Sequence, residues 1–237
     1  MIPIRDSLRS RRFPIVTVGL IAANLAAFVH EMMLGPAALQ PFVVEHAVVP
    51  ARLLAGVAAG GLGAAQQGLT ILSSMFLHGD LLHFLGNMWF LWIFGDNVED
   101  RFGRVGYAVF YVIAGVIAAM SQVLFAPGSE VPMIGASGAV AGVLGAYARF
   151  YPGARVLAVV PIFVFLQWTE LPALFFLGLW FLLQVVSSVS GAVGVAWWAH
   201  IAGFVAGLAL SFLAKERAQL EYRPKPKGRG KVIRLRR

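Results

Sequence analysis

Residues 135–142 read GASGAVAG, a serine between small residues at the start of a long apolar run. Gly138 and Gly142 are four positions apart, so in a helix they form one small-residue face that lets a second helix approach closely. Ser137 would lie in the first turn of that helix. A serine in a membrane helix commonly bonds back to its own backbone, so this stretch alone does not identify a reactive hydroxyl.

A second polar stretch, FLHGDLLHFLGN, covers residues 76–87. His83 and Asn87 are four residues apart, so a helix would stack them on one face. Strongly polar groups are expensive inside a bilayer, and each needs a structural or chemical reason. One reason is an interhelical polar bond that holds a bundle together. Asp80, just before this helix, is best interpreted as its N-cap.

A third stretch, AHIAGFVAG, covers residues 199–207. His200 is followed by Gly203 and Gly207, which repeat the small-residue spacing of the first stretch. A lone histidine in a membrane helix is often a packing or gating group. Helix packing therefore explains both glycine faces, and the same close packing would bring His200 toward the serine-bearing helix.

Composition identifies lipid as the main solvent of this chain. Of its 237 residues, 59% are hydrophobic and only 13% are charged, and the mean hydropathy is +0.78. A soluble domain carries about 25% charged residues, so a water-soluble fold is excluded. Cysteine is absent from the sequence, which removes disulfides, thiol nucleophiles and thiolate metal sites. We expect neither a cofactor nor a metal.

Hydropathy divides the chain into six apolar segments, each a candidate for the helix of about 20 residues that crosses the hydrocarbon. They cover residues 13–33, 81–94 with an apolar extension upstream, 105–125, 134–151, 172–189 and 197–214. The expected fold class is an all-α polytopic membrane protein with a six-helix bundle. The expected organisation is a basic N-terminus (1–12), a membrane domain (13–214) and a basic tail without fixed structure (215–237).

Three segments have competing interpretations. The charged start and apolar run of residues 13–33 also resemble a secretory signal, but no clear cleavage site follows, so we expect an uncleaved anchor. Residues 155–169 are apolar enough for a seventh span, but they are short and Pro161 would break a helix. We interpret them as a re-entrant or interfacial element on the inner side. Residues 35–68 form a long outer connection that is expected to be partly embedded.

The net charge of +8 is concentrated at the two ends. Four arginines and one aspartate lie in residues 1–13, and ten Lys/Arg with two glutamates lie in residues 215–237. The positive-inside rule therefore places both termini in the cytoplasm, next to anionic lipid. The tail has no recognisable nucleic-acid motif, so we expect no nucleic-acid partner.

The six-span topology places three of the polar residues at one depth. Spans two, four and six run from outside to inside, and Ser137, His200 and His83 each lie near the start of one of them. A serine needs a base to take its proton, and histidine suits neutral pH. The residues predict a Ser137/His200 dyad without a carboxylate. The Asn87 amide, a His83 ring N–H and the Ser137 backbone N–H are available as oxyanion donors.

These three motifs, in this order, resemble the signatures of rhomboid intramembrane serine proteases of the bacterial type. The resemblance covers about residues 2–214, including MIPIRD (1–6) and FGDNVEDRFG (94–103). It implies a six-helix rhomboid-like bundle. It also implies these roles: Ser137 as nucleophile, His200 as base, Asn87 and His83 as oxyanion stabilisers, and Gly135 beside the nucleophile.

The chain departs from the family pattern at two places. Some members carry a Trp-Arg pair in the first outer loop, and none occurs here. Many members place an aromatic residue four positions after the serine, beneath the histidine ring, where this chain has Ala141. Another residue, from span five or six, must then support His200.

The resemblance implies an endopeptidase that cleaves membrane-spanning helices near the outer face of the membrane. Expected partners are transmembrane-helix substrates and lipid, and the expected location is a bacterial inner membrane. One alternative is a catalytically silent rhomboid-like binder, which would ordinarily lack the serine or the histidine. Another is a transporter, which would carry ionisable residues along a full transmembrane path.

Overall fold

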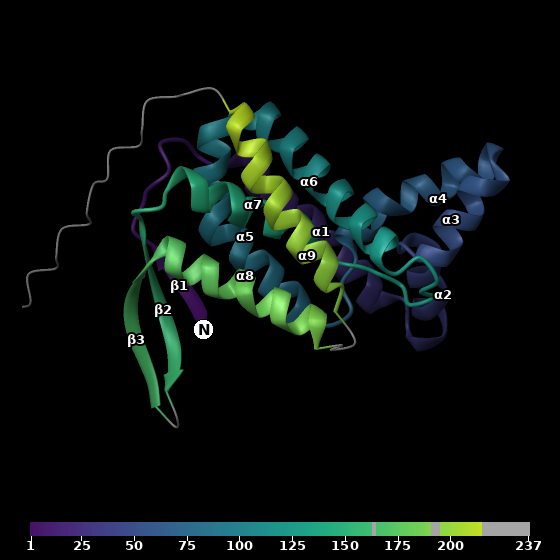
Figure 1. Ribbon diagram of the computed structural model, residues 1–237. Coiled ribbons are helices and arrows are strands. Elements are labelled where there is room, and N and C mark those ends of the chain that lie inside the picture. The colour runs from purple at the N-terminus through teal and green to yellow at the C-terminus, as the bar shows by residue number, and fades with distance from the viewer. Residues whose placement is uncertain (163–164, 191–194, 215–237) are drawn as a thin grey trace, which may run out of the picture.

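The computed structural model describes residues 1–162, 165–190 and 195–214 (Figure 1). Each of the six apolar segments predicted from hydropathy overlaps a helix. These helices are α1 (Ile15–Met33), α5 (Leu81–Phe102), α6 (Arg104–Phe125), α7 (Ser137–Phe150), α8 (Ala173–Val189) and α9 (Trp197–Leu210, followed by the 3-10 turn Ser211–Leu213). Within the described residues, α1 and α6 are long and apolar enough to cross a membrane by themselves. A bent pair that ends with α5 is a third candidate span.

The long outer connection is helical. It forms α2 (Pro36–His46), α3 (Pro50–Ala59), α4 (Gly61–Ser73) and the 3-10 turn η1 (Ser74–Phe76). Proline occupies the first position of α2 and of α3, where its missing N–H removes no helical bond. The chain bends by 81° between the α4–η1 segment and α5. Figure 1 shows α2, α3 and α4 at the end of the molecule that is farthest from the strands.

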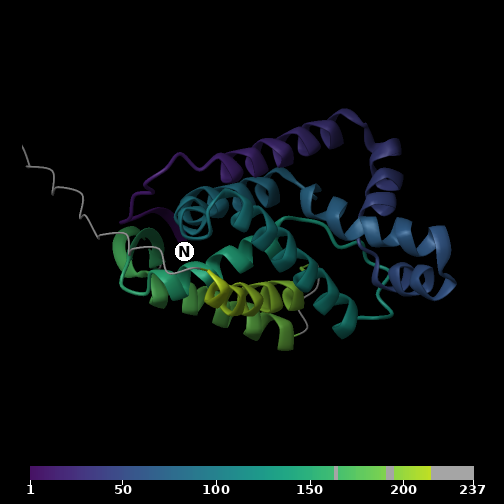
Figure 2. The ribbon, with the colours of Figure 1, turned by 90° about the horizontal axis from the view of Figure 1, so that it is seen from above.

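Helix α7 is the centre of the bundle. Every residue from Gly138 to Ala148 is buried, which small glycine and alanine side chains allow. Helices α5, α6, α8 and α9 all pack against α7. Figure 2 shows α1 on one flank of the bundle and α8 and α9 on the opposite flank. Residues on α7 therefore have protein rather than lipid around them.

Helices α7 and α9 touch through their backbones. A Cβ atom on Gly203 would overlap the Gly138 carbonyl oxygen, and one on Gly207 would overlap the Gly142 carbonyl oxygen. On the other side of α7, a Cβ on Gly142 would lie 2.6 Å from the Ala114 Cβ of α6. Only glycine permits this approach. We call Gly138, Gly142, Gly203 and Gly207 the glycine seam.

The described residues also contain an antiparallel sheet, so the expectation of an all-α fold is wrong. Its strands are β1 (Ile2–Asp6), β2 (Arg155–Ile162) and β3 (Phe165–Pro172), in that spatial order. The segment that we interpreted as a re-entrant or interfacial element is thus the β2–β3 hairpin. It has four Val and two Phe, together with single Ile, Trp and Thr residues, all of which favour strands, and it contains Pro161, which disfavours a helix.

The N-terminal segment is likewise an integral part of the fold. Strand β1 pairs with β2, for example Ile2 with Val159. The Asp6 carboxylate accepts hydrogen bonds from the Tyr147 hydroxyl (2.6 Å) and from the Asn97 side-chain amide (2.9 Å). These bonds connect the N-terminal strand to α7 and to α5.

The start of α1 is capped from α5. The buried Glu99 carboxylate accepts the Thr17 backbone N–H (2.8 Å), the Thr17 hydroxyl (2.9 Å) and the Val16 backbone N–H (3.1 Å). A helix begins with unpaired N–H groups, and a carboxylate there satisfies them and complements the helix dipole. Four residues after Glu99, Gly103 adopts a φ of +73° and turns the chain from α5 into α6.

Candidate active site

Ser137 is the first residue of α7, and the loop before it is fixed in a conformation that requires glycine. Gly135 adopts a φ of +119°, a region that side chains disfavour. Its backbone N–H donates to the Ser74 carbonyl oxygen at 2.8 Å. A Cβ on Gly135 would lie 2.7 Å from His83 Nε2. The glycine therefore sets the entry of the chain into α7 and leaves room for the His83 ring.

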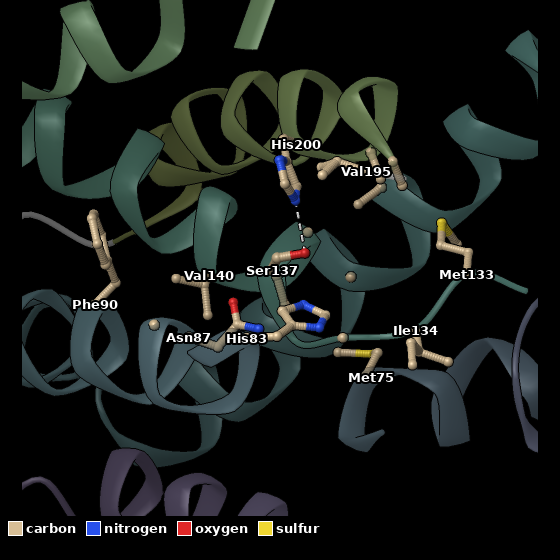
Figure 3. Close-up of a pocket in the computed structure, with 18 of the residues that line it drawn as sticks. Met75, His83, Asn87, Phe90, Met133, Ile134, Ser137, Val140, Val195 and His200 are labelled. Carbon is tan, nitrogen blue, oxygen red and sulfur yellow. Dashed lines mark hydrogen bonds between the residues drawn. The ribbon is translucent and has the colours of Figure 1, made fainter. Parts of the chain in front are cut away.

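The structure brings Ser137 and His200 together. Ser137 Oγ lies 2.8 Å from His200 Nε2, a hydrogen-bond distance, although the residues are 63 positions apart. His200 lies in the first turn of α9, next to the backbone contact between Gly203 and Gly138. Figure 3 shows the two side chains pointing at each other across the space between α7 and α9. The glycine seam is what makes this distance attainable.

The second nitrogen of the His200 ring contacts a residue that sequence reasoning missed. His200 Nδ1 lies 2.8 Å from Gln184 Oε1, which α8 supplies. In the described part of the chain, Ser137 and Gln184 are the hydrogen-bond partners of this ring, and neither is a carboxylate. The available signal was an isolated amide in the apolar segment 172–189. It lies on the same face of α8 as the buried Ala173 and Leu177.

Two aromatic rings flank His200 in place of the aromatic residue missing at position 141. The Trp180 ring centroid lies 6.1 Å from that of His200, at an interplanar angle of 35°. The Trp197 ring lies at the same distance and meets His200 edge-on. Ala141 is fully buried, and its Cβ lies 3.4 Å from the point that a Cβ on Gly203 would occupy. Support for His200 therefore comes from α8 and α9.

His83 and Asn87 lie on the other side of Ser137 (Figure 3). They occupy the first two turns of α5, whose N-terminus is capped by Asp80, as predicted. The Asp80 carboxylate accepts the His83 backbone N–H at 2.8 Å. Asn87 is 7% exposed, and its side-chain Nδ2 is buried without a hydrogen-bond partner among the described residues. A buried donor without an acceptor is unusual and marks a position where an acceptor would be favoured.

The contacts of the His83 ring indicate which nitrogen carries its proton. The Gly79 backbone N–H donates to His83 Nδ1 at 3.4 Å. A nitrogen that accepts a bond from a backbone N–H is unprotonated in the neutral ring, so the proton is on Nε2. That atom is the one beside Gly135. His83 thus presents an N–H donor next to the loop that leads into Ser137.

A cavity of about 520 Å³ contacts all four side chains. Ser137, His200, His83 and Asn87 line it together with mainly apolar residues, including Phe90, Val140 and Trp180. Polar groups that converge in a mostly apolar cavity are typical of a binding or catalytic site. The described residues contain no group of three or more His, Cys, Asp or Glu side chains arranged to hold a metal ion.

This arrangement has the components of nucleophilic acyl transfer. It places a hydroxyl against an imidazole and two side-chain N–H donors on the far side of the hydroxyl. All of them come from the first two turns of α5 or from the first turns of α7 and α9. The start of α7 adds its backbone N–H groups and the positive end of its dipole.

Comparison with known proteins identifies the same region. A family profile described as "Rhomboid domain" matches residues 65–217, more than half of the chain. The mouse Presenilin-associated rhomboid-like protein, mitochondrial, is 33% identical over 107 residues, which are 44% of this chain and 28% of that protein. RHOMBOID-like protein 4 of Arabidopsis thaliana is 29% identical over 150 residues, 62% of this chain and 34% of that protein. The matched regions span less than half of these relatives.

Proposed function

The chain belongs to the rhomboid family, and from this membership and the geometry of the site we propose that it is an intramembrane serine endopeptidase. Its substrates are transmembrane helices, which it cleaves near the outer face of the membrane. The observation that carries the proposal is the 2.8 Å contact between Ser137 Oγ and His200 Nε2 in a cavity that is also lined by Asn87, whose Nδ2 has no hydrogen-bond partner among the described residues.

The proposed topology has six membrane-crossing helices and both termini in the cytoplasm. In this proposal the spans are α1, α5, α6, α7, α8 and α9, and the basic residues at the two ends of the sequence favour the inner side. An even number of crossings returns the chain to the side where it starts. In this topology α5, α7 and α9 begin at the outer side, and the candidate site lies just below that surface.

In the proposed acylation step, Ser137 Oγ attacks the carbonyl carbon of the scissile peptide bond. His200 Nε2 accepts the hydroxyl proton as the new C–O bond forms. The tetrahedral intermediate then collapses, the C–N bond breaks, and the proton on His200 passes to the leaving amine. The products are a free amine and an ester on Ser137.

The negative oxygen of the intermediate is assigned to the donors opposite His200. Asn87 Nδ2 has no other hydrogen-bond partner in the described part of the chain, and His83 Nε2–H lies beside Gly135. The Ser137 backbone N–H completes the set. Donors that are fixed before the reaction stabilise the developing charge without reorganisation, and each such donor is worth about 10²- to 10³-fold in kcat.

Deacylation repeats the sequence with water. His200 Nε2 removes a proton from the water molecule that attacks the ester, and it returns that proton to Ser137 Oγ. A helix in lipid keeps its backbone bonds internal, so the scissile segment must unwind before its carbonyl can enter the cavity. Glycine or proline near the cleavage site should therefore favour a substrate.

The test is cleavage of a model transmembrane-helix substrate by the full chain in liposomes. Wild type is expected to release two fragments whose masses locate the cut, and Ser137→Ala is expected to release none. Ser188→Ala is the matched control, because the Ser188 hydroxyl bonds the Val185 carbonyl of its own helix and lies outside the cavity lining. Equal cleavage by wild type and Ser137→Ala would contradict the proposal.

A catalytically silent binder is the competing outcome of that test. It would retain the substrate helix in a cross-linking experiment, with no cleavage by any variant.

We propose an integral multi-pass membrane location for the chain. The relatives named above come from mouse and Arabidopsis thaliana, so they give no support to the expected bacterial subtype or bacterial inner membrane.

A further inference from the structure

Gln184 occupies a position from which it can control the His200 ring. It is 8% exposed, and α8 holds it between the helix backbone and the imidazole. Its side chain makes two hydrogen-bond contacts, one from each end of the amide. A buried amide with both ends engaged has little freedom to rotate, so its orientation is a fixed property of the fold.

The backbone of α8 sets which end of the amide faces His200. Gln184 Nε2 donates to the Trp180 carbonyl oxygen at 3.2 Å. A carbonyl oxygen can only accept, so the NH₂ group must be at that end of the amide. The opposite end, Oε1, then lies 2.8 Å from His200 Nδ1.

An oxygen at that position decides which nitrogen of His200 carries the proton. Gln184 Oε1 can only accept, so Nδ1 must be the protonated nitrogen and must donate to it. Nε2 is then left with its lone pair directed at Ser137 Oγ. The other tautomer would place a lone pair against Oε1 and an N–H against the serine, where His200 could not accept the hydroxyl proton.

We propose that Gln184 is a positioning residue that holds His200 in the Nδ1-protonated form and thereby makes Nε2 the base for Ser137. The chain thus uses a neutral amide where hydrolases with a Ser-His-Asp triad use a carboxylate. The catalytic consequence of this role rests on the proposed function, but the tautomer itself does not.

The direct test is ring ¹⁵N NMR of the full chain in detergent micelles with labelled histidine. The sequence has five histidines, and the His200 signals are identified by their loss in His200→Phe. Wild type is expected to show a protonated Nδ1 and an unprotonated Nε2. Gln184→Met, which is similar in size but lacks the amide, is expected to shift His200 toward the Nε2-protonated form.

Two further variants make this test specific. Gln184→Glu keeps an acceptor oxygen at the same reach and is expected to retain the wild-type tautomer. Gln122→Met removes a glutamine of α6 that does not line the cavity, and it is expected to leave the His200 signals unchanged. A wild-type ring protonated on Nε2, or an unchanged tautomer in Gln184→Met, would overturn the proposal.

The kinetic test measures kcat and KM of the same variants for cleavage of the transmembrane-helix substrate. Gln184→Met is expected to lower kcat by about 10²- to 10⁴-fold, the range of general-base catalysis, with little change in KM. Gln184→Glu should recover most of that loss, which a purely structural role would not predict. If the tautomer shifts as expected but wild type cleaves nothing, the proposed function fails and the positioning role stands. If wild type cleaves and Gln184→Met is unaffected, the positioning role fails alone.

Discussion

His83 Nε2 lies 2.7 Å from the point that a Cβ atom on Gly135 would occupy. The absence of a side chain at Gly135 therefore determines where the His83 ring can lie relative to Ser137. This relationship connects the loop before α7 with the first turn of α5, the two elements that we assign to the oxyanion side of the site.

Replacement of Gly135 by alanine should impair the oxyanion side of the site. In Gly135→Ala the new Cβ would displace the His83 ring, and the φ of +119° would strain the backbone by about 1–3 kcal/mol. We expect kcat on the helix substrate to fall at least tenfold. Gly128→Ala is the control, since Gly128 has open space around it. Wild-type kcat in Gly135→Ala would contradict the placement of His83.

Loss of the Asn87 amide should slow the chemical step without weakening substrate binding. Asn87→Ala is expected to lower kcat by about 10²- to 10³-fold with KM nearly unchanged, because the transition-state oxyanion loses one donor. Asn24→Ala is the control, because Asn24 donates to the Leu20 carbonyl of its own helix, far along the sequence from the site. An unchanged kcat in Asn87→Ala would leave Asn87 as a structural residue.

A methyl group in the glycine seam should separate α7 from α9. Gly207→Ala places a Cβ on the Gly142 carbonyl oxygen, and overpacking of this kind costs about 1–3 kcal/mol. We expect a lower Tm in detergent together with a lower kcat, because the helices that carry Ser137 and His200 are forced apart. Gly178→Ala in α8 should change neither quantity, because among the described residues no side chain and no other helix lies within 4 Å of the added Cβ.

The Glu99 carboxylate should contribute to stability and not to chemistry. Glu99→Ala leaves three donors of the first turn of α1 without their acceptor and should lower the free energy of unfolding by about 2 kcal/mol. Thermal unfolding in detergent measures this loss. The exposed Glu45 of α2 is the matched control, and Glu45→Ala should unfold as wild type does. A wild-type Tm in Glu99→Ala would rule out the capping role.

The proposed topology predicts opposite sides for the two ends of α7. A reporter fused after Gly128, between α6 and α7, should report a location on the outer side of the membrane. A reporter fused after Gly153, between α7 and β2, should report a location in the cytoplasm. The two fusions act as controls for each other. Activity of both reporters on one side would refute the six-span arrangement.

The helices of the six apolar segments could be predicted because a long apolar run is a direct signal of a membrane helix, whereas α2, α3 and α4 were expected only as part of a long connection. The sheet could not, because residues 155–169 are apolar without a regular period, so hydropathy does not separate strand from helix there. The partner strand Ile2–Asp6 lies about 150 positions earlier in the sequence. Its pairing with β2 depends on tertiary packing, which no local pattern encodes.

The same contrast holds at the candidate site. Ser137, His200, His83 and Asn87 could be selected because polar groups are rare in apolar segments, and the expected topology puts all of them except Asn87 at one depth. Gln184 could not be selected in the same way, because the residue that orients a catalytic histidine is ordinarily a carboxylate. An amide can serve only if its orientation is fixed, and the Trp180 carbonyl that fixes it becomes evident only from the coordinates.

Direct main-chain contact between α7 and α9 also has a mechanical consequence. Where interlocking side chains separate two helices, changes of rotamer let the pair slide or spread when the surrounding lipid thins or thickens. Glycine offers no such compliance, so these two helices should tilt together as one stiff unit. The distance between the Ser137 hydroxyl and the His200 imidazole should then vary little between thin and thick bilayers. Hydrophobic mismatch should therefore change the rate at which substrate helices reach the site more than the rate of the chemical step.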